Sequence, residues 1–238
     1  MSAQPIKPII LHLLQQGRLD VEAFVQGLTE ADRTAIGTLA RWSAKDHLAH
    51  RAFWHQDLIS KLTGRPATDQ PSPDSEPNED QLNDMVVEKN KRRPWSEVQA
   101  EAAQSDTELI RLVEQLSEED LTVVRRFPWQ SEEWPLYTAF LGSCYEHDQE
   151  HLAQYYLDHD DLPRAIEIRE RCANRILESD LPARVKGAFL YNLTCFYTQL
   201  NQLAKAATLL KEALTLAPDF EDWSQRDPDL APLRDQST

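Results

Sequence analysis

The sequence predicts an all-α protein: an up-down four-helix bundle followed by a short helical extension. Apolar residues recur at intervals of three and four along most of the chain, which is the period of an amphipathic helix. Runs of alternating β-branched residues are missing, and none of the six glycines forms a phosphate-binding loop after a strand-like run. The chain has 238 residues, 41% of them hydrophobic, which is enough for two units.

The charge balance restricts the partners that the chain can bind. Asp and Glu number 40 against 25 Lys and Arg, giving a formal net charge of −15. Such a surface repels phosphate backbones and anionic lipid, so we expect no nucleic acid and no membrane as partners. No apolar stretch approaches the roughly 20 residues of a membrane span, the secretory signal pattern is missing, and three widely spaced cysteines do not suggest a disulfide framework. We therefore expect a cytoplasmic protein with reduced thiols.

The first two helices are predicted from their end signals. The first begins at Pro5, in a first turn that tolerates proline, and ends near Thr29. The second begins at Ser43, whose spacing from Asp46 is that of a capping box, and ends at Gly64.

One stripe of the second helix carries a histidine. His50, Trp54, Leu58 and Leu62 recur every four residues, and this stripe should face the core. The ring nitrogens of a histidine that faces the core need a hydrogen-bond partner or a metal ion.

The remaining helices of the bundle follow from the same periodicity. Residues 80–90 are helical in pattern, and Pro94 begins a further helix that continues to Leu116. The aromatic segment 121–134 is expected to fold over one end of the bundle. The fourth helix is expected over 135–158. Long helices of this kind form a bundle whose interior can hold a metal between facing helices.

The fourth helix carries the candidate metal ligands His147 and His151. Residues four apart on a helix share a face, with Cβ atoms roughly 5–6 Å apart, so both imidazoles can reach one ion. Two ligands seldom hold a catalytic ion, and His50 is the candidate third. The simpler interpretation is that His50 is a core histidine with ordinary hydrogen bonds, and that His147 and His151 are two surface residues that happen to be four apart. Cys144 is either a fourth ligand or, more in keeping with a buried cysteine, a small apolar residue.

Four neighbouring polar residues are expected to lie outside the metal centre. His47 and His55 are interpreted as surface or packing residues. Glu146 and Glu150 flank the pair and could serve as outer acceptors or a general base, but their helical phase favours a solvated face.

Four stretches resemble the DinB/YfiT-like superfamily and, within it, the ClbS/DfsB-like four-helix-bundle proteins. They are Trp42-Ser-Ala-Lys-Asp46-His-Leu-Ala-His50, Asn90-Lys-Arg-Arg-Pro-Trp95-Ser-Glu-Val, Leu116-Ser-Glu-Glu-Asp-Leu121 and Tyr145-Glu-His147-Asp-Gln-Glu-His151. The resemblance implies a three-histidine site at His50, His147 and His151 for a divalent metal, most often Zn or Ni. Characterised relatives include thiol-dependent S-transferases, a maleylpyruvate isomerase and a cyclopropane hydrolase that confers self-resistance to a genotoxin. A small-molecule substrate, a low-molecular-weight thiol and a homodimer are therefore expected.

The C-terminal part resembles a tetratricopeptide (TPR) repeat. The matching positions are Leu190, Leu193, Tyr197, Ala206, Leu210, Ala213 and Pro218. Leu230 and Leu233 are expected to cap the last apolar groove. We therefore predict a DinB-like bundle over 1–160 and a TPR-like extension with a capping tail over 161–238.

Three functions remain open from the sequence. The first is a metal-dependent enzyme acting on a small electrophile by thiol transfer or hydrolysis. The second is a scaffold whose TPR-like groove binds a protein partner. The third is a metal-independent hydrolase or resistance protein of the ClbS type.

Overall fold

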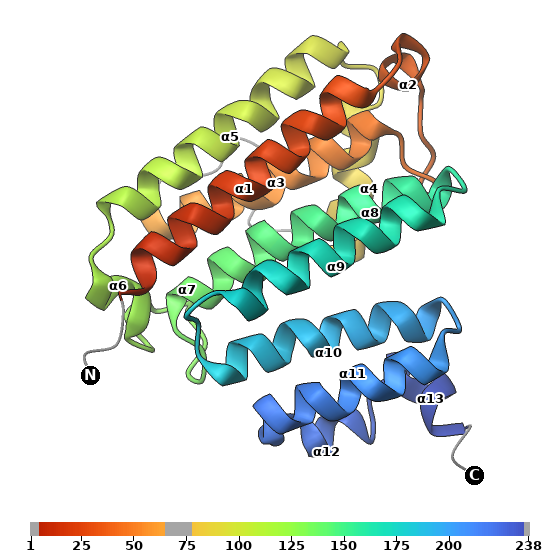
Figure 1. The fold of residues 1–238 in the computed structure, drawn as a ribbon. Coiled ribbons are helices and arrows are strands. Elements are labelled where there is room, and N and C mark those ends of the chain that lie inside the picture. Colours follow the sequence, from red (N-terminus) through yellow and green to blue (C-terminus); the bar gives the residue numbers. More distant parts are fainter. Residues whose placement is uncertain (1–4, 65–77, 236–238) are drawn as a thin grey trace. The chain divides into compact units, whose positions relative to one another are not determined.

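The computed structural model describes residues 5–64 and 78–235. Within these residues the regular elements are helices, so the predicted all-α class is confirmed (Figure 1). The chain divides into two compact units, Met1–Ile166 and Glu167–Thr238, with the boundary inside α9 (Leu162–Glu178). The assignment of domains to 1–160 and 161–238 stays a prediction.

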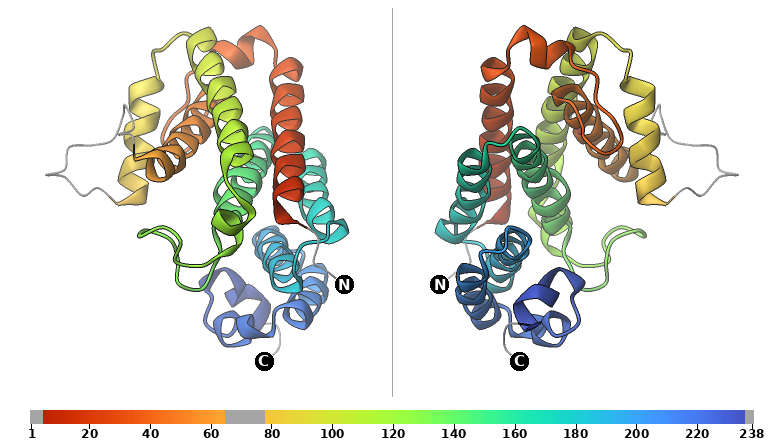
Figure 2. Two further views of the ribbon diagram at one scale, coloured as in Figure 1. Left: turned by 90° about the vertical axis from the view of Figure 1, so that its left-hand side faces the viewer. Right: turned by 90° about the vertical axis from the view of Figure 1, so that its right-hand side faces the viewer.

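The first unit contains four long helices and several short ones. Its elements are α1 (Ile6–Gly27), α2 (Glu30–Thr34), α3 (Ala44–Thr63), α4 (Glu79–Asn90), α5 (Trp95–Gln115), α6 (Glu118–Thr122), α7 (Leu136–Ala139), the π-helix η1 (Phe140–Glu146) and α8 (His147–Asp158). Both α1 and α3 pack against α5 and against η1 and α8, which makes a four-helix bundle. Helix α4 packs on the outer side of α3 (Figure 2).

Contacts at the helix ends fix the directions of the chain. The Lys45 ammonium at the start of α3 donates to the carbonyls of Lys91 and Arg93, just before α5. The backbone N–H of Ile6 at the start of α1 donates to Glu118, just after α5. Helices α3 and α5 therefore run parallel to each other and antiparallel to α1, with α4 as the return connection. The guanidinium of Arg41, before α3, reaches the last turn of α8, so α8 runs antiparallel to α3.

The limits of α3 agree with the sequence signals. The Ser43 hydroxyl accepts the backbone N–H of Asp46, and the Asp46 carboxylate accepts the N–H of Ser43, which completes the predicted capping box. Gly64 ends the helix with a φ of 67°, in the left-handed region that glycine tolerates best. The turns of α3 that carry His47 and His50 begin directly after the capping box at Ser43.

The fourth helix of the bundle contains a π-helical segment that the periodicity did not predict. The backbone N–H of His147 bonds to the carbonyl of Gly142, five residues earlier, where an α-helix would use the fourth. The wider turn shifts the phase of every side chain before it relative to α8. Cys144 lies within this segment, where it is buried and interacts electrostatically with Asp148 and Asp106.

The second unit contains a helical hairpin and a folded tail. Helices α10 (Ala183–Gln199) and α11 (Leu203–Leu216) pack on each other. The tail continues through η2 (Pro218–Phe220), α12 (Glu221–Ser224), η3 (Pro228–Leu230) and α13 (Ala231–Asp235). Leu230 is buried in a cluster with Leu190, Tyr191 and Ala213.

Candidate metal centre

Three histidines from two helices converge inside the first unit. His50 comes from α3, and His147 and His151 lie one turn apart on α8. The Nε2 atom of His147 lies 3.0 Å from Nε2 of His50 and 3.0 Å from Nε2 of His151. Three nitrogens bound about 2.0–2.1 Å from a tetrahedral ion lie about 3.3 Å from one another, so the spacing suits a shared ion after a small adjustment.

Burial keeps all three rings neutral. It lowers the pKa of His50 to about 2, and the neighbouring His147 adds to the effect. Burial also lowers the pKa of His147, against the opposing charge of Asp148. The pKa of His151 falls well below its ordinary value because of burial and the other two histidines. Metal ligands must be deprotonated imidazoles, so the three nitrogens are in the state that binds a cation.

Two tryptophans form aromatic walls around the histidines. The ring of Trp42 stacks on His151, with centroids 5.4 Å apart and planes 6° apart, and lies 4.8 Å from the ring of His50. Trp54 meets His50 edge to face at 6.1 Å. These contacts restrict the rotation of two of the candidate ligands and surround them with apolar surface.

The donor set is that of an open site. The candidate ligand atoms all lie within 4.8 Å of one another, and no fourth His, Cys, Asp or Glu joins them in the described part of the chain. Structural zinc sites are closed by four protein ligands, whereas catalytic sites keep a position for water or substrate. The residues present therefore fit a divalent metal with at least one free position.

A fourth histidine lies next to this centre. His47, three residues before His50 on α3, is buried, and its Nδ1 atom is 3.1 Å from Nδ1 of His151. Burial, assisted by the charge of His159, lowers the pKa of His47 to about 3. His47 is therefore neutral as well. Its contact is with the far nitrogen of His151, not with the converging Nε2 atoms.

A group of four buried charged residues, the charge quartet, lies beside the three histidines on α3, α5 and α8. It consists of Arg51, His55, Asp106 and Asp148. The Arg51 Nη2 atom lies 2.9 Å from Asp106 and 2.6 Å from Asp148. The two nitrogens of His55 lie 3.3 Å from the same two carboxylates.

Electrostatics identifies the quartet as an ion-pair network. Burial alone would lower the pKa of His55, but Asp148 and Asp106 outweigh it and raise the pKa to about 9. Two cations then balance two carboxylates. Although His55, Asp106 and Asp148 are spaced like metal ligands, the guanidinium of Arg51 already binds both carboxylates and would repel a second cation.

The structure corrects several sequence-based interpretations of the neighbouring residues. For His47 and His55, interpreted from the sequence as surface or packing residues, the structure excludes the surface alternative, because both are buried and take part in polar contacts. The three-residue spacing of His47 and His50 could have indicated that His47 lies near the candidate ligands, because residues three apart are neighbours on a helix. Glu146 is buried, whereas Glu150 is exposed as expected. Burial, with the charges of Asp148 and Asp106, raises the pKa of the Cys144 thiol well above its ordinary value, which agrees with the apolar interpretation of that residue.

The fold and the site define a helical-bundle protein with a candidate metal centre between facing helices. A family model of the DinB superfamily matches residues 13–155, more than half of the chain. The chain therefore belongs to the DinB superfamily, which includes metal-binding proteins. No curated protein and no solved structure shows significant similarity to it. Among the described helices, none is long and apolar enough to cross a membrane.

Proposed function

We propose that this protein is a metal-dependent enzyme that acts on a small electrophilic substrate by thiol transfer or hydrolysis. The metal ligands are His50, His147 and His151. The observation that carries the proposal is the convergence of three neutral imidazole nitrogens without a fourth protein ligand among the described residues. Membership of the DinB superfamily supports the same assignment.

The donor set supports Zn or Ni as the metal. Imidazole nitrogen suits Zn, Ni, Cu and Fe, and three-histidine sites with an open position are known for catalytic zinc. When bound, a divalent cation would supply Lewis-acid chemistry, either acidifying a water molecule or binding a substrate thiolate. A low-molecular-weight thiol is the proposed co-substrate.

The protein's own residues bind and orient the reactants. The histidines hold their nitrogens toward one point, and Trp42 fixes the plane of His151 by stacking on it. Trp42 and Trp54 offer apolar faces to a substrate bound beside His50. Because the surrounding rings are buried and neutral, charged interactions at this point are only weakly screened by water.

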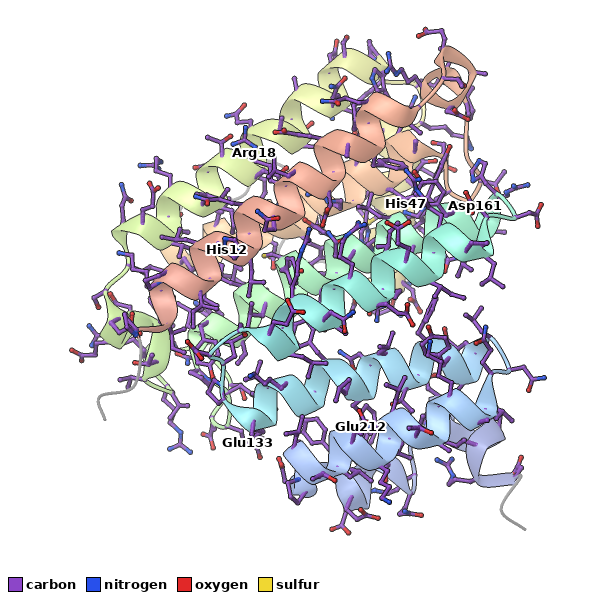
Figure 3. All side chains as sticks on the ribbon, viewed as in Figure 1. His12, Arg18, His47, Glu133, Asp161 and Glu212 are labelled. Carbon is purple, nitrogen blue, oxygen red and sulfur yellow. The ribbon has the colours of Figure 1, made fainter. Side chains whose placement is uncertain are left out.

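The first experiment measures metal content. Tag-free protein is analysed for Zn and Ni by elemental analysis, alongside His147→Ala and the matched control His12→Ala. His12 is exposed on α1 and belongs to neither buried cluster (Figure 3). We expect about one metal per chain in the wild type and in the control, and loss in His147→Ala. Wild-type protein that binds neither metal after incubation with excess ion would overturn the proposal.

The second experiment separates the proposed subtypes. Thiol transfer and hydrolysis of small electrophiles are assayed with and without chelator. Loss of turnover in chelator supports the metal-dependent enzyme. Full turnover in chelator identifies instead a metal-independent protein of the ClbS/DfsB type, which is the alternative that the sequence resemblance supports.

We also propose that the second unit is a TPR-like extension. Gly187 on α10 lies so close to α11 and the residue after it that an added Cβ would be 2.6 Å from that of Ala217. Such close packing of small residues is typical of TPR helix pairs. One face of the hairpin is covered by the chain's own Leu230. This favours an extension of the bundle over a scaffold that binds a partner through that face, and the homodimer stays a prediction.

A further inference from the structure

The side chain of His47 is a buried polar group that the proposed chemistry does not use. It is 2% exposed, and its Nε2 atom has no hydrogen-bond partner among the described residues. A buried polar atom without a partner lowers stability. The contact that accounts for a histidine at this position is therefore the one made by its other nitrogen, 3.1 Å from Nδ1 of His151 (Figure 3 labels His47 on α3).

Metal binding would fix the direction of this hydrogen bond. A neutral imidazole carries a single N–H, so a His151 that offers the lone pair of Nε2 to a cation must carry its proton on Nδ1. That N–H faces Nδ1 of His47. It can donate only if Nδ1 of His47 is unprotonated, which requires the His47 proton to be on Nε2.

Without a metal, the opposite arrangement is available. Nε2 of His151 lies 3.0 Å from Nε2 of His147, and when Nε2 of His151 carries the proton it can donate a hydrogen bond to His147. Nδ1 of His151 is then an acceptor, and Nδ1 of His47 can donate to it. The contact between His47 and His151 thus exists in two tautomeric forms, and only one of them leaves Nε2 of His151 free for a metal.

We propose that His47 is a positioning residue that accepts the Nδ1–H of metal-bound His151 and holds that ring in the coordinating orientation and tautomer. This inference rests on the proposed metal site. Hydrogen bonds from outer residues to metal-bound histidines orient the ring and increase its basicity. Trp42 holds both partners in place, because its ring stacks on His151 and lies 5.3 Å from the ring of His47.

The test measures Zn²⁺ affinity of the full-length chain by chelator competition. We expect His47→Leu to weaken binding by about 10–100-fold, the usual loss for an outer partner of a ligating histidine. His47→Asn can place a side-chain oxygen near the position of Nδ1 and should recover part of the affinity. In metal-free protein, His47→Leu should leave stability nearly unchanged, since it removes one hydrogen bond together with a buried Nε2 atom that has no partner among the described residues. A purely structural His47 would show the reverse pattern, with lower stability and wild-type affinity.

A second measurement covers the case in which the variants fail to fold. The ¹⁵N chemical shifts of wild-type protein identify the tautomer of each histidine. In the Zn²⁺-loaded chain, Nδ1 of His47 should be unprotonated and Nδ1 of His151 protonated. Wild-type affinity in His47→Leu, or a protonated Nδ1 of His47 in the loaded chain, would overturn the inference alone. A wild-type chain that binds no Zn²⁺ would overturn the metal site together with it.

Discussion

Arg51 donates a 2.6 Å hydrogen bond to Asp148, and both side chains are almost completely buried. Each of the two residues directly follows a candidate metal ligand, since Arg51 follows His50 and Asp148 follows His147. The ion pair therefore joins α3 to α8 in the same register that brings the two histidines to within 3.0 Å of each other. The charge quartet thus lies beside the candidate metal centre without contributing one of its three histidines.

The first prediction concerns this ion pair. Replacing Arg51 by Met should lower the free energy of unfolding by about 3–5 kcal/mol, because two buried carboxylates would keep only His55 as a cation. Zn²⁺ affinity should fall as well, since the register of α3 and α8 is no longer fixed. Urea denaturation and chelator competition measure the two effects.

A matched control for this variant is Arg18→Met. Arg18 pairs with Glu22 on the exposed surface of α1, so its loss should cost no more than about 1 kcal/mol. Equal destabilisation by the two substitutions would contradict the role assigned to Arg51.

The second prediction concerns stability at alkaline pH. The pKa of His55 is about 9 in the folded chain and about 6.5 in the unfolded one. A raised folded-state pKa gives stability that is complete below pH 6.5 and lost as the pH rises toward 9. We expect a loss on the order of 3 kcal/mol over this range, measured by urea denaturation of metal-free protein. The variant His55→Gln should be less stable at pH 6.5 and lack the alkaline decline; an unchanged decline in that variant would refute the assignment.

The sequence predicted the helices and the candidate ligands because both follow from short-range spacing. The capping box at Ser43 and the left-handed Gly64 are local signals, and they placed α3 correctly. The spacing of His147 and His151 puts two rings on one face of any helix. The stripe through His50 required only that the helix be amphipathic.

The parts that the sequence did not predict depend on contacts between distant segments. From the sequence His55 could be only a surface or packing residue, because its partners Asp106 and Asp148 come from α5 and α8. The periodicity of residues 135–158 predicted one continuous helix and gave no sign of the π-helical turn before His147. His47 illustrates the limit, since its spacing was visible but its partner was 104 residues away.

A third prediction tests the packing of α10 on α11. Gly187→Ala would place a Cβ 2.6 Å from the Cβ of Ala217 and 2.9 Å from the carbonyl oxygen of Ala213. The backbone of α11 must move to relieve these contacts, so we expect a loss of about 1–3 kcal/mol in spite of the better helix propensity of alanine. Gly27→Ala is the control, because nothing lies within 4 Å of its added Cβ. Thermal denaturation should show a lower midpoint for Gly187→Ala only, and a stabilised Gly187→Ala would show that the hairpin tolerates a wider separation.

The last prediction concerns acid sensitivity of the metal-free chain. Burial lowers the folded-state pKa values of His47, His50, His147 and His151 below 6.5, so the unfolded chain takes up protons first as the pH falls. The stability from these groups is present above pH 6.5 and lost below it, with a slope of about 1.4 kcal/mol per pH unit for each histidine. Urea denaturation in chelator at pH 7, 6 and 5 should show this decline. His47→Leu should reduce the slope by about 1.4 kcal/mol per pH unit, the contribution of one histidine. Bound Zn²⁺ should raise the denaturation midpoint at pH 7 and lose this effect toward pH 5, because protons compete for the same nitrogens. A stability that stays constant between pH 7 and 5 in chelator would mean that these rings are open to solvent, and the buried centre would be wrong.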